Sequence, residues 1–122
     1  MNLLSEKIPV FVYGTLKKGY ENHKYLERSG VKFIGEAKTV QKYVMYFNKY
    51  PYVSKDKAIS HIHGELYFVD EKVLKDLDKL EGHPDWYRRE IVQIRLENGK
   101  ELEAYLYFNP FEKGHVISSG KF

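Results

Sequence analysis

The 122-residue chain contains no cysteine, and it has only four prolines and one tryptophan. Without cysteine it can form no disulfide, no thiolate nucleophile and no zinc–thiolate site. Residues 1–4 are too short for the apolar core of a secretory signal, and no apolar run approaches the length of a membrane span. We therefore expect a cytoplasmic protein that does not enter a membrane.

The charge of the chain is also modest and dispersed. The formal net charge is +3, and lysine and glutamate alternate rather than cluster, so we expect no nucleic acid partner. The length suits one domain spanning residues 1–122. Eleven tyrosines raise the aromatic content to 16%, which provides rings for a core and hydroxyls for a pocket.

Apolar patterning predicts more strand than helix. A buried strand ends at Gly14, and a short helix capped by Asn22 runs to about Ser29 and stops at Gly30. The main helix covers residues 71–80, with Asp70 as its cap and Gly82 after its end. The remaining expected strands are residues 31–40, 43–48, 61–69, 90–96 and 100–108, with a turn at 48–51.

The last two strands form a predicted hairpin around Asn98-Gly99. A three-residue loop over 97–99 sets Ile94 opposite Leu102 and keeps like residues on each face, whereas a two-residue turn does not. We expect Gly99 in the left-handed conformation. These elements predict an α+β fold, a small mixed or antiparallel sheet curled around a core with one main and one short helix.

The glycine loop after the first strand is the first candidate site. Gly14 and Gly19 have the spacing of a phosphate loop, but Tyr20-Glu21 stands where lysine and serine or threonine are required. What remains is a strand end, a glycine that permits close approach and the free hydroxyl of Thr15. On these residues alone, a plain β-turn explains the loop better than a ligand site.

Glu81 is the second candidate, because helical periodicity places it between Leu74 and Leu77 on the apolar face. A carboxylate there faces the core or a cleft, and it lies at the end of the helix where the dipole disfavours negative charge. Both effects raise the pKa of a carboxyl toward the range of a general base. The alternative is a frayed last turn that leaves Glu81 in solvent.

Other residues suggest weaker sites. His61 and His63 share a strand face and could hold a metal with His83 or His115, although paired strand histidines more often bond locally. No serine has the context of a nucleophile elbow. Tyr105 and Tyr107 share one face of a strand and could line a pocket. We expect Arg89 to pair with a protein carboxylate rather than with a substrate.

Four segments resemble motifs of the γ-glutamylcyclotransferase-like superfamily, most closely its γ-glutamylamine cyclotransferases. The first and third motifs are specific together, in this order and spacing, and the third reads Leu77-Asp78-x-x-Glu81-x-x-Pro84-x-x-Tyr87-x-Arg89. The other three are Val10-Phe11-Val12-Tyr13-Gly14-Thr15-Leu16-Lys17-Lys18-Gly19 with Asn22-His23 behind it, Gly64-Glu65-Leu66-Tyr67-x-Val69-Asp70, and Ile117-Ser118-Ser119-Gly120. Residues 42–60 match no motif that identifies a leaving group.

The resemblance implies a small mixed β-barrel with flanking helices and a reaction that needs neither cofactor nor metal. In that reaction the α-amine of a γ-glutamyl group attacks its own γ-carbonyl, which releases 5-oxoproline and an amine or amino acid. The implied substrate-binding residues are Tyr13, Gly14, Thr15 and Leu16, and Glu81 is the implied base. The implied partner is a small molecule, and we expect a monomer or weak homodimer. The alternative is an inactive module that binds γ-glutamyl or other small carboxylate ligands.

Overall fold

The computed structural model describes residues 8–110 and 114–122; residues 1–4, considered above for a signal segment, lie outside them. The elements follow one another in this order: β1 (Ile8–Val12), η1 (Glu21–Leu26), β2 (Val31–Asn48), β3 (Tyr50–Ser54), β4 (Ser60–Val69), α1 (Glu71–Glu81), β5 (Arg88–Leu96), β6 (Glu101–Phe108) and β7 (His115–Val116). None of the described helices is long and apolar enough to cross a membrane.

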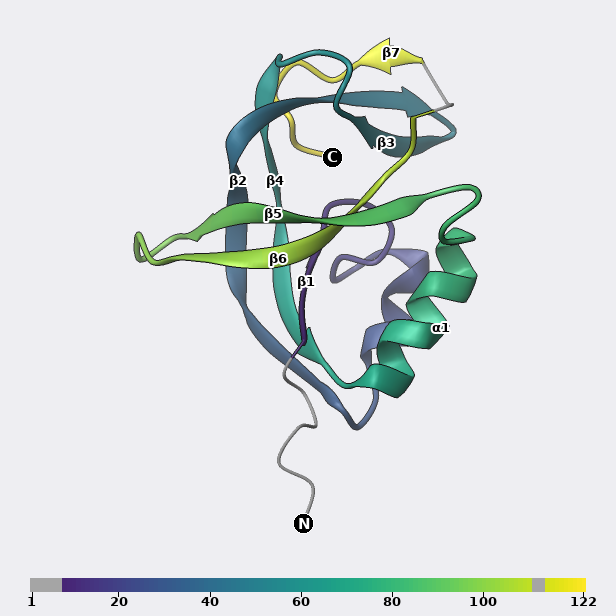
Figure 1. The fold of residues 1–122 in the computed structure, drawn as a ribbon. Helices are drawn as coiled ribbons and strands as arrows, with labels where there is room; N and C mark the ends of the chain where they lie inside the picture. The colour runs from purple at the N-terminus through teal and green to yellow at the C-terminus, as the bar shows by residue number, and fades with distance from the viewer. Residues whose placement is uncertain (1–7, 111–113) are drawn as a thin grey trace.

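Five strands form a closed ring in the order β2, β4, β1, β6 and β5 (Figure 1). The ring closes because β5 pairs back onto β2, with Ala37 opposite Leu96. The β1–β6 pair is parallel and the other pairs are antiparallel. The predicted α+β barrel with one main helix and one short helix is therefore confirmed, and β1 supplies its parallel contact.

The second strand differs from the prediction, because residues 31–48 form one continuous strand rather than two. Its register against β4 shifts between Lys38 and Lys42, and from Val44 onward the strand pairs with β3 and β7 instead of the ring (Figure 1). The predicted turn at 48–51 is shorter, since Lys49 alone turns the chain with a φ of 69°. Pro51 lies inside β3, where the edge of the sheet tolerates its missing N–H.

The short helix also departs from expectation. It is the 3-10 helix η1, it ends at Leu26 rather than near Ser29, and it begins after Tyr20 without a side-chain cap. Asn22 was predicted to cap it but lies within it, and the Asn22 amide Nδ2 donates to the Thr15 hydroxyl oxygen at 2.9 Å. Contact with the preceding loop therefore takes precedence over local capping at this residue.

The main helix follows the prediction closely. Its first turn is capped by Asp70, whose carboxylate accepts from the Val73 N–H at 2.9 Å, and it ends before Gly82 in the left-handed conformation. Leu77 is fully buried among residues of β1, β4 and β6. Burial of such a side chain stabilises the fold by roughly 1.5–3 kcal/mol, which anchors α1 against the barrel.

The strand β1 is buried on both faces, so it lies between two cores. Phe11 points into the barrel beside Leu66 and Ile94, while Val10 and Val12 belong to the layer between the barrel and α1. Alternation of side chains along a strand produces this division. The end of β1 is consequently held close to the last turn of α1.

The hairpin of β5 and β6 has the predicted register. Ile94 lies opposite Leu102 and Arg95 opposite Glu101, and Gly99 has a positive φ of 88°. The hairpin crosses the barrel (Figure 1) and brings Arg89 and Tyr107, which pair with each other, to the end of α1.

Candidate active site

A cleft of about 160 Å³ opens between the end of β1 and the last turn of α1. It holds a group of several heavy atoms and is smaller than a drug-sized pocket. Its lining residues come from six parts of the chain: Phe11, Val12, Tyr13, Gly14, Thr15, Leu16, Asn22, Tyr50, Pro51, Leu80, Glu81, Tyr87 and Tyr107. The five site residues chosen from the sequence, 13–16 and 81, therefore lie on one cleft although 65 positions separate the two groups.

The loop after β1 is a β-turn, as its sequence alone favoured, and the turn forms one wall of the cleft. The Lys17 N–H donates to the Gly14 carbonyl at 3.0 Å, and the Asn22 N–H donates to the Thr15 carbonyl at 3.0 Å. Among the residues that the structure describes, the N–H groups of Thr15 and Leu16 have no hydrogen-bond acceptor. Two such N–H groups beside a cleft are suited to a carboxylate or an oxyanion.

Gly14 is required by close packing rather than by an unusual φ angle. A Cβ atom at this position would lie 2.8 Å from the Cγ atom of Pro51, well inside contact distance. Pro51 and Gly14 both line the cleft. A side chain on residue 14 would therefore displace the wall that β3 contributes.

The hydroxyl groups of the loop are already engaged. The Tyr13 hydroxyl is buried and donates to the Tyr107 carbonyl at 2.8 Å, and burial raises its pKa well above the ordinary value. The Thr15 hydroxyl, predicted to be free, accepts from the Asn22 amide. Tyr13 thus offers the cleft its ring and backbone, while Thr15 keeps one hydroxyl proton to donate.

Glu81 is the last residue of α1 and is half-buried at the cleft. The helix does not fray there, because the N–H groups of Gly82 and His83 close it onto the carbonyls of Lys79 and Asp78. Within the described part of the chain, the Glu81 carboxyl group has no hydrogen-bond or ion-pair partner. Burial raises its pKa to about 7. The alternative of a solvent-exposed Glu81 is wrong.

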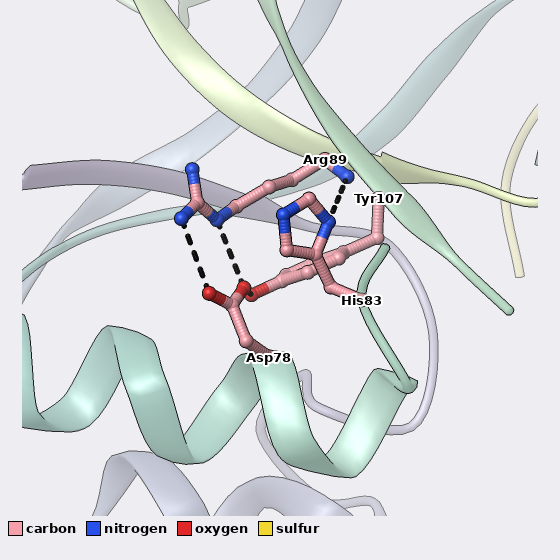
Figure 2. A network of polar contacts seen from close by, with 4 residues as sticks. All are labelled: Asp78, His83, Arg89 and Tyr107. Atoms are coloured by element: carbon pink, nitrogen blue, oxygen red, sulfur yellow. Dashed lines mark hydrogen bonds and ion pairs between the residues drawn. The ribbon is translucent and has the colours of Figure 1, made fainter. Parts of the chain in front are cut away.

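Asp78, three residues before Glu81, has the opposite environment (Figure 2). The Arg89 guanidinium donates to both of its carboxylate oxygens, at 2.8 and 3.1 Å, and the Tyr107 hydroxyl donates at 2.7 Å. The Asp78 hydrogen bond raises the pKa of Arg89, and burial together with the same carboxylate raises the pKa of Tyr107. The prediction that Arg89 pairs with a protein carboxylate is confirmed.

The histidines considered for a metal are engaged separately. His61 Nδ1 lies 2.9 Å from the Thr39 carbonyl oxygen, and His83 Nδ1 accepts from the Arg89 N–H at 3.2 Å. Across residues 8–110 and 114–122, no three histidine, aspartate or glutamate side chains gather as metal ligands would. The described residues thus offer no grouping that matches the metal hypothesis.

Of the two tyrosines that could line a pocket according to the sequence, Tyr107 lines the cleft and Tyr105 does not. Other lining residues were not predicted. Leu80 belongs to the apolar stripe of α1 and could have been found from helical spacing, whereas Tyr87 follows the turn after the helix and could not. Pro51 could not be found either, because its predicted place was a turn, whereas it pairs with Phe47 in β3 and meets Gly14 from a distant part of the chain.

Comparisons with known proteins show which family this chain is similar to. A family model described as gamma-glutamyl cyclotransferase, AIG2-like, matches residues 10–122. A Methanocaldococcus jannaschii protein with the provisional name gamma-glutamylcyclotransferase is 57% identical over 114 residues, which are 93% of each chain. Gamma-glutamylaminecyclotransferase A of Danio rerio is 37% identical and covers 82% of this chain and 68% of its own. The crystal structure of a mouse AIG2-like protein superposes with a TM-score of 0.74 at 29% identity, covering 84% of this chain and 76% of that one.

Proposed function

Because the chain belongs to the gamma-glutamyl cyclotransferase, AIG2-like family, we propose that residues 1–122 act as one catalytic domain that releases 5-oxoproline from a γ-glutamyl compound. The observation that carries the proposal is the Glu81 carboxyl group. It lies on a cleft without a partner among the described residues, and its pKa of about 7 suits proton transfer near neutral pH.

The reaction needs one group that first removes and later returns a proton. The substrate α-amine has an ordinary pKa of ~8, so its ammonium form first loses one proton to solvent and the neutral amine attacks. Ionised Glu81 accepts a second proton from this nitrogen as it bonds to the γ-carbonyl carbon and closes the five-membered ring. The protonated carboxyl then gives the proton to the leaving nitrogen as the old carbon–nitrogen bond breaks. The products are 5-oxoproline and a free amine.

The loop after β1 supplies the grip on the substrate in this proposal. The N–H groups of Thr15 and Leu16 bind either the α-carboxylate or the oxyanion that develops on the γ-carbonyl oxygen. Tyr13 and Gly14 shape the wall, since the Tyr13 ring is fixed by its hydrogen bond and Gly14 leaves room for Pro51. Because the attack is intramolecular, the cleft contributes mainly by holding the substrate in the folded conformer.

The proposed leaving group is an amine, as in a γ-glutamylamine. The support is the name of the Danio rerio relative, gamma-glutamylaminecyclotransferase A, and the resemblance around Lys17-Lys18-Gly19. We further propose that the substrate is a free small molecule and that the protein acts as a monomer or weak homodimer in the cytoplasm.

A substrate panel tests the proposal. Purified protein is incubated with γ-glutamyl amino acids, γ-glutamyl-ε-lysine and simple γ-glutamylamines, and 5-oxoproline is measured by mass spectrometry. We expect release of 5-oxoproline, fastest from the amines, and its loss in Glu81→Gln. No turnover of any compound, or full activity in Glu81→Gln, contradicts the proposal.

The same substrate panel distinguishes the enzyme from the alternative, an inactive binding module. A module that binds γ-glutamyl ligands without turnover gives saturable binding by calorimetry and no product after long incubation. The unpartnered Glu81 carboxyl group argues against that outcome, because binding alone gains nothing from a desolvated acid.

A further inference from the structure

Tyr50, the first residue of β3, lies at the open side of the cleft. Most of the residues that line the cleft are buried, and four are half-buried: Thr15, Asn22, Leu80 and Glu81. Among the lining residues that the structure describes, Tyr50 alone is exposed, with 47% of its surface accessible to solvent. A ligand that extends out of the cleft therefore has this side chain beside it.

The backbone of Tyr50 is fixed by its neighbours in the chain. Lys49 turns the chain with a φ of 69°, and Tyr50 pairs with Asn48 across that turn. Pro51 is buried and packs so closely on Gly14 that a Cβ atom there would lie 2.8 Å from the Pro51 Cγ atom. A residue that precedes proline is also held in the extended region. The Tyr50 ring is therefore attached to a rigid part of the cleft wall.

The Tyr50 side chain, by contrast, has no partner within the described part of the chain. Its hydroxyl makes no hydrogen bond and its ring stacks on no other ring, whereas Tyr52, two residues along β3, stacks on Tyr87 with 6.0 Å between the ring centroids. A single exposed aromatic residue on a surface needs no explanation. An aromatic ring that lines a cleft, however, offers apolar surface to the molecule that the cleft binds.

The charges around the cleft limit what this molecule can be. None of the described lining residues is a lysine, arginine or histidine, and Glu81 is the one carboxylic acid among them. The N–H groups of Thr15 and Leu16 are suited to one anionic group, which in the proposed reaction belongs to the γ-glutamyl part of the substrate. A carboxylate on the leaving group would share the cleft with ionised Glu81 and the negative face of the Tyr50 ring, without a cation to compensate it.

Resting on the proposed function, we propose that Tyr50 is a specificity-determining residue whose ring packs on the methylene groups next to the leaving nitrogen. A cleft of about 160 Å³ is too small for a γ-glutamyl group together with an alkyl chain. Because Glu81 must reach the leaving nitrogen to return its proton, the chain on that nitrogen begins at the open side of the cleft and meets Tyr50. The preferred substrates are then γ-glutamyl derivatives of unbranched alkylamines.

The contact with Tyr50 should act on binding rather than on chemistry. The methylene groups do not react, so they pack on the ring equally well in the bound substrate and in the transition state. Loss of the ring should therefore raise KM for substrates with long chains and leave their kcat unchanged. The shortest substrate should be unaffected, whereas a merely structural role of Tyr50 would impair all substrates alike.

The test is a series of γ-glutamyl-n-alkylamines from methyl to hexyl, with kcat and KM measured from release of 5-oxoproline. A methylene fully removed from water gains about fourfold in affinity, and one that packs on a single face gains roughly twofold. We therefore expect kcat/KM of the wild type to rise roughly eightfold from methyl to butyl. Tyr50→Ala should lose this dependence and Tyr50→Phe should keep it.

Ile91→Ala is the control for this series, since Ile91 is 57% exposed on β5 and does not line the cleft. It should keep the wild-type dependence on chain length. A wild type without such a dependence, or the same dependence in Tyr50→Ala as in wild type, overturns the proposal.

A cation at the open side of the cleft gives an independent test. γ-Glutamylglycine and γ-glutamylmethylamine differ only by one carboxylate on the leaving group. Tyr50→Lys supplies the missing cation, so the ratio of kcat/KM for the glycine compound to that for the methylamine compound should rise at least about fivefold over wild type. An unchanged ratio, in a variant whose thermal melt matches that of the wild type, contradicts the placement of Tyr50 beside the leaving group.

A binding measurement separates this inference from the proposed function. Calorimetry on Glu81→Gln gives the dissociation constants of the same alkylamine series without turnover. Tighter binding of the longer chains, lost when Tyr50→Ala is added, supports the role of Tyr50 even if the wild type releases no 5-oxoproline. Equal binding along the series overturns that role whether or not the wild type turns the compounds over.

Discussion

The two carboxylates near the end of α1, Asp78 and Glu81, lie in opposite environments. Asp78 receives three hydrogen bonds from Arg89 and Tyr107, whereas Glu81, on the next turn, receives none within the described residues. The partners of Asp78 compensate its charge and tie α1 to β5 and β6. Glu81 is desolvated without compensation, which raises its pKa to about 7. The difference separates a carboxylate that fixes the site from one that is available to react.

Position on the helix reinforces this contrast. Glu81 lies at the C-terminus of α1, where the partial negative charge of the last carbonyls disfavours a carboxylate. The same turn is closed by Gly82 and His83 onto the helix, so Glu81 cannot relieve the cost by unwinding. The hydrogen bonds of Asp78 thus fix the helix turn on which the Glu81 carboxylate is destabilised by burial and by the helix dipole.

Replacement of Glu81 should have the largest effect on activity and is the strongest test of this contrast. Glu81→Gln keeps the shape of the side chain and removes the proposed base, so we expect the turnover number on a γ-glutamyl substrate to fall about 10²–10⁴-fold. Release of 5-oxoproline under saturating substrate measures it. Glu71→Gln, at the exposed start of the same helix, is the control and should retain wild-type activity. Equal activity of the two variants would remove the distinction between Glu81 and an ordinary surface acid.

The same variant should gain stability where it loses activity. The folded state raises the pKa of Glu81 from 4.5 to about 7, so it binds the proton more tightly than the unfolded chain does. The protonated Glu81 carboxyl group therefore contributes about 3 kcal/mol to the free energy of unfolding. This contribution is fully present below pH 4.5 and is lost as the pH rises through 7. Urea unfolding should find Glu81→Gln more stable than wild type at pH 8 and equal to it at pH 4. A wild-type stability that does not fall between pH 5 and 8 would contradict this.

Asp78→Asn should have the reverse pattern of effects. Arg89 and Tyr107 lose a charged acceptor in a half-buried site, which costs roughly 1.5–3 kcal/mol of unfolding free energy. Activity should fall less than in Glu81→Gln, and the acid limb of the pH profile should keep its midpoint, because Asp78 is a positioning residue. Asp76→Asn breaks the more exposed pair with Arg28, which solvent screens, and should cost less stability than Asp78→Asn. A shifted midpoint in Asp78→Asn would mean that Asp78 exchanges the proton itself.

The smallest expected effect belongs to Tyr107→Phe. It removes the hydrogen bond to Asp78 but keeps the cleft wall and the carbonyl that receives the Tyr13 hydroxyl, so about 1 kcal/mol of stability should be lost. Tyr105→Phe is its control, since the Tyr105 ring stacks under Arg89 and its hydroxyl has no partner among the described residues. Thermal melts of the two variants measure the difference, and equal losses would show that the Tyr107 hydroxyl adds nothing.

Much of this site could be predicted from the sequence because local rules act on it. Glu81 could be placed by counting 100° per residue along α1, and the hairpin register followed from matching the faces around Gly99. Strand ends and helix caps are likewise set by neighbours in the chain, as at Asp70 and Gly82. The end of β1 and the end of α1 therefore could be predicted separately.

What could not be predicted depends on contacts between distant segments. The hydrogen bond from Tyr107 to Asp78 joins residues 29 positions apart in the sequence, and no local pattern predicts it. Pro51 and Asn22 were mispredicted for a different reason, because a contact with a nearby segment overrides the local preference of each residue. Pro51 pairs with Phe47 of β2 instead of lying in a turn, and the Asn22 amide donates to the Thr15 hydroxyl instead of capping η1.

The role of Glu81 as the base can be tested directly by titrating its carboxyl group with carbon-13 NMR, using Glu81→Gln to assign the resonance. We expect a midpoint near 7, set by burial without a partner. A midpoint near the ordinary value of 4.5 would mean that Glu81 is solvated or paired, and the contrast with Asp78 would no longer identify it as the base.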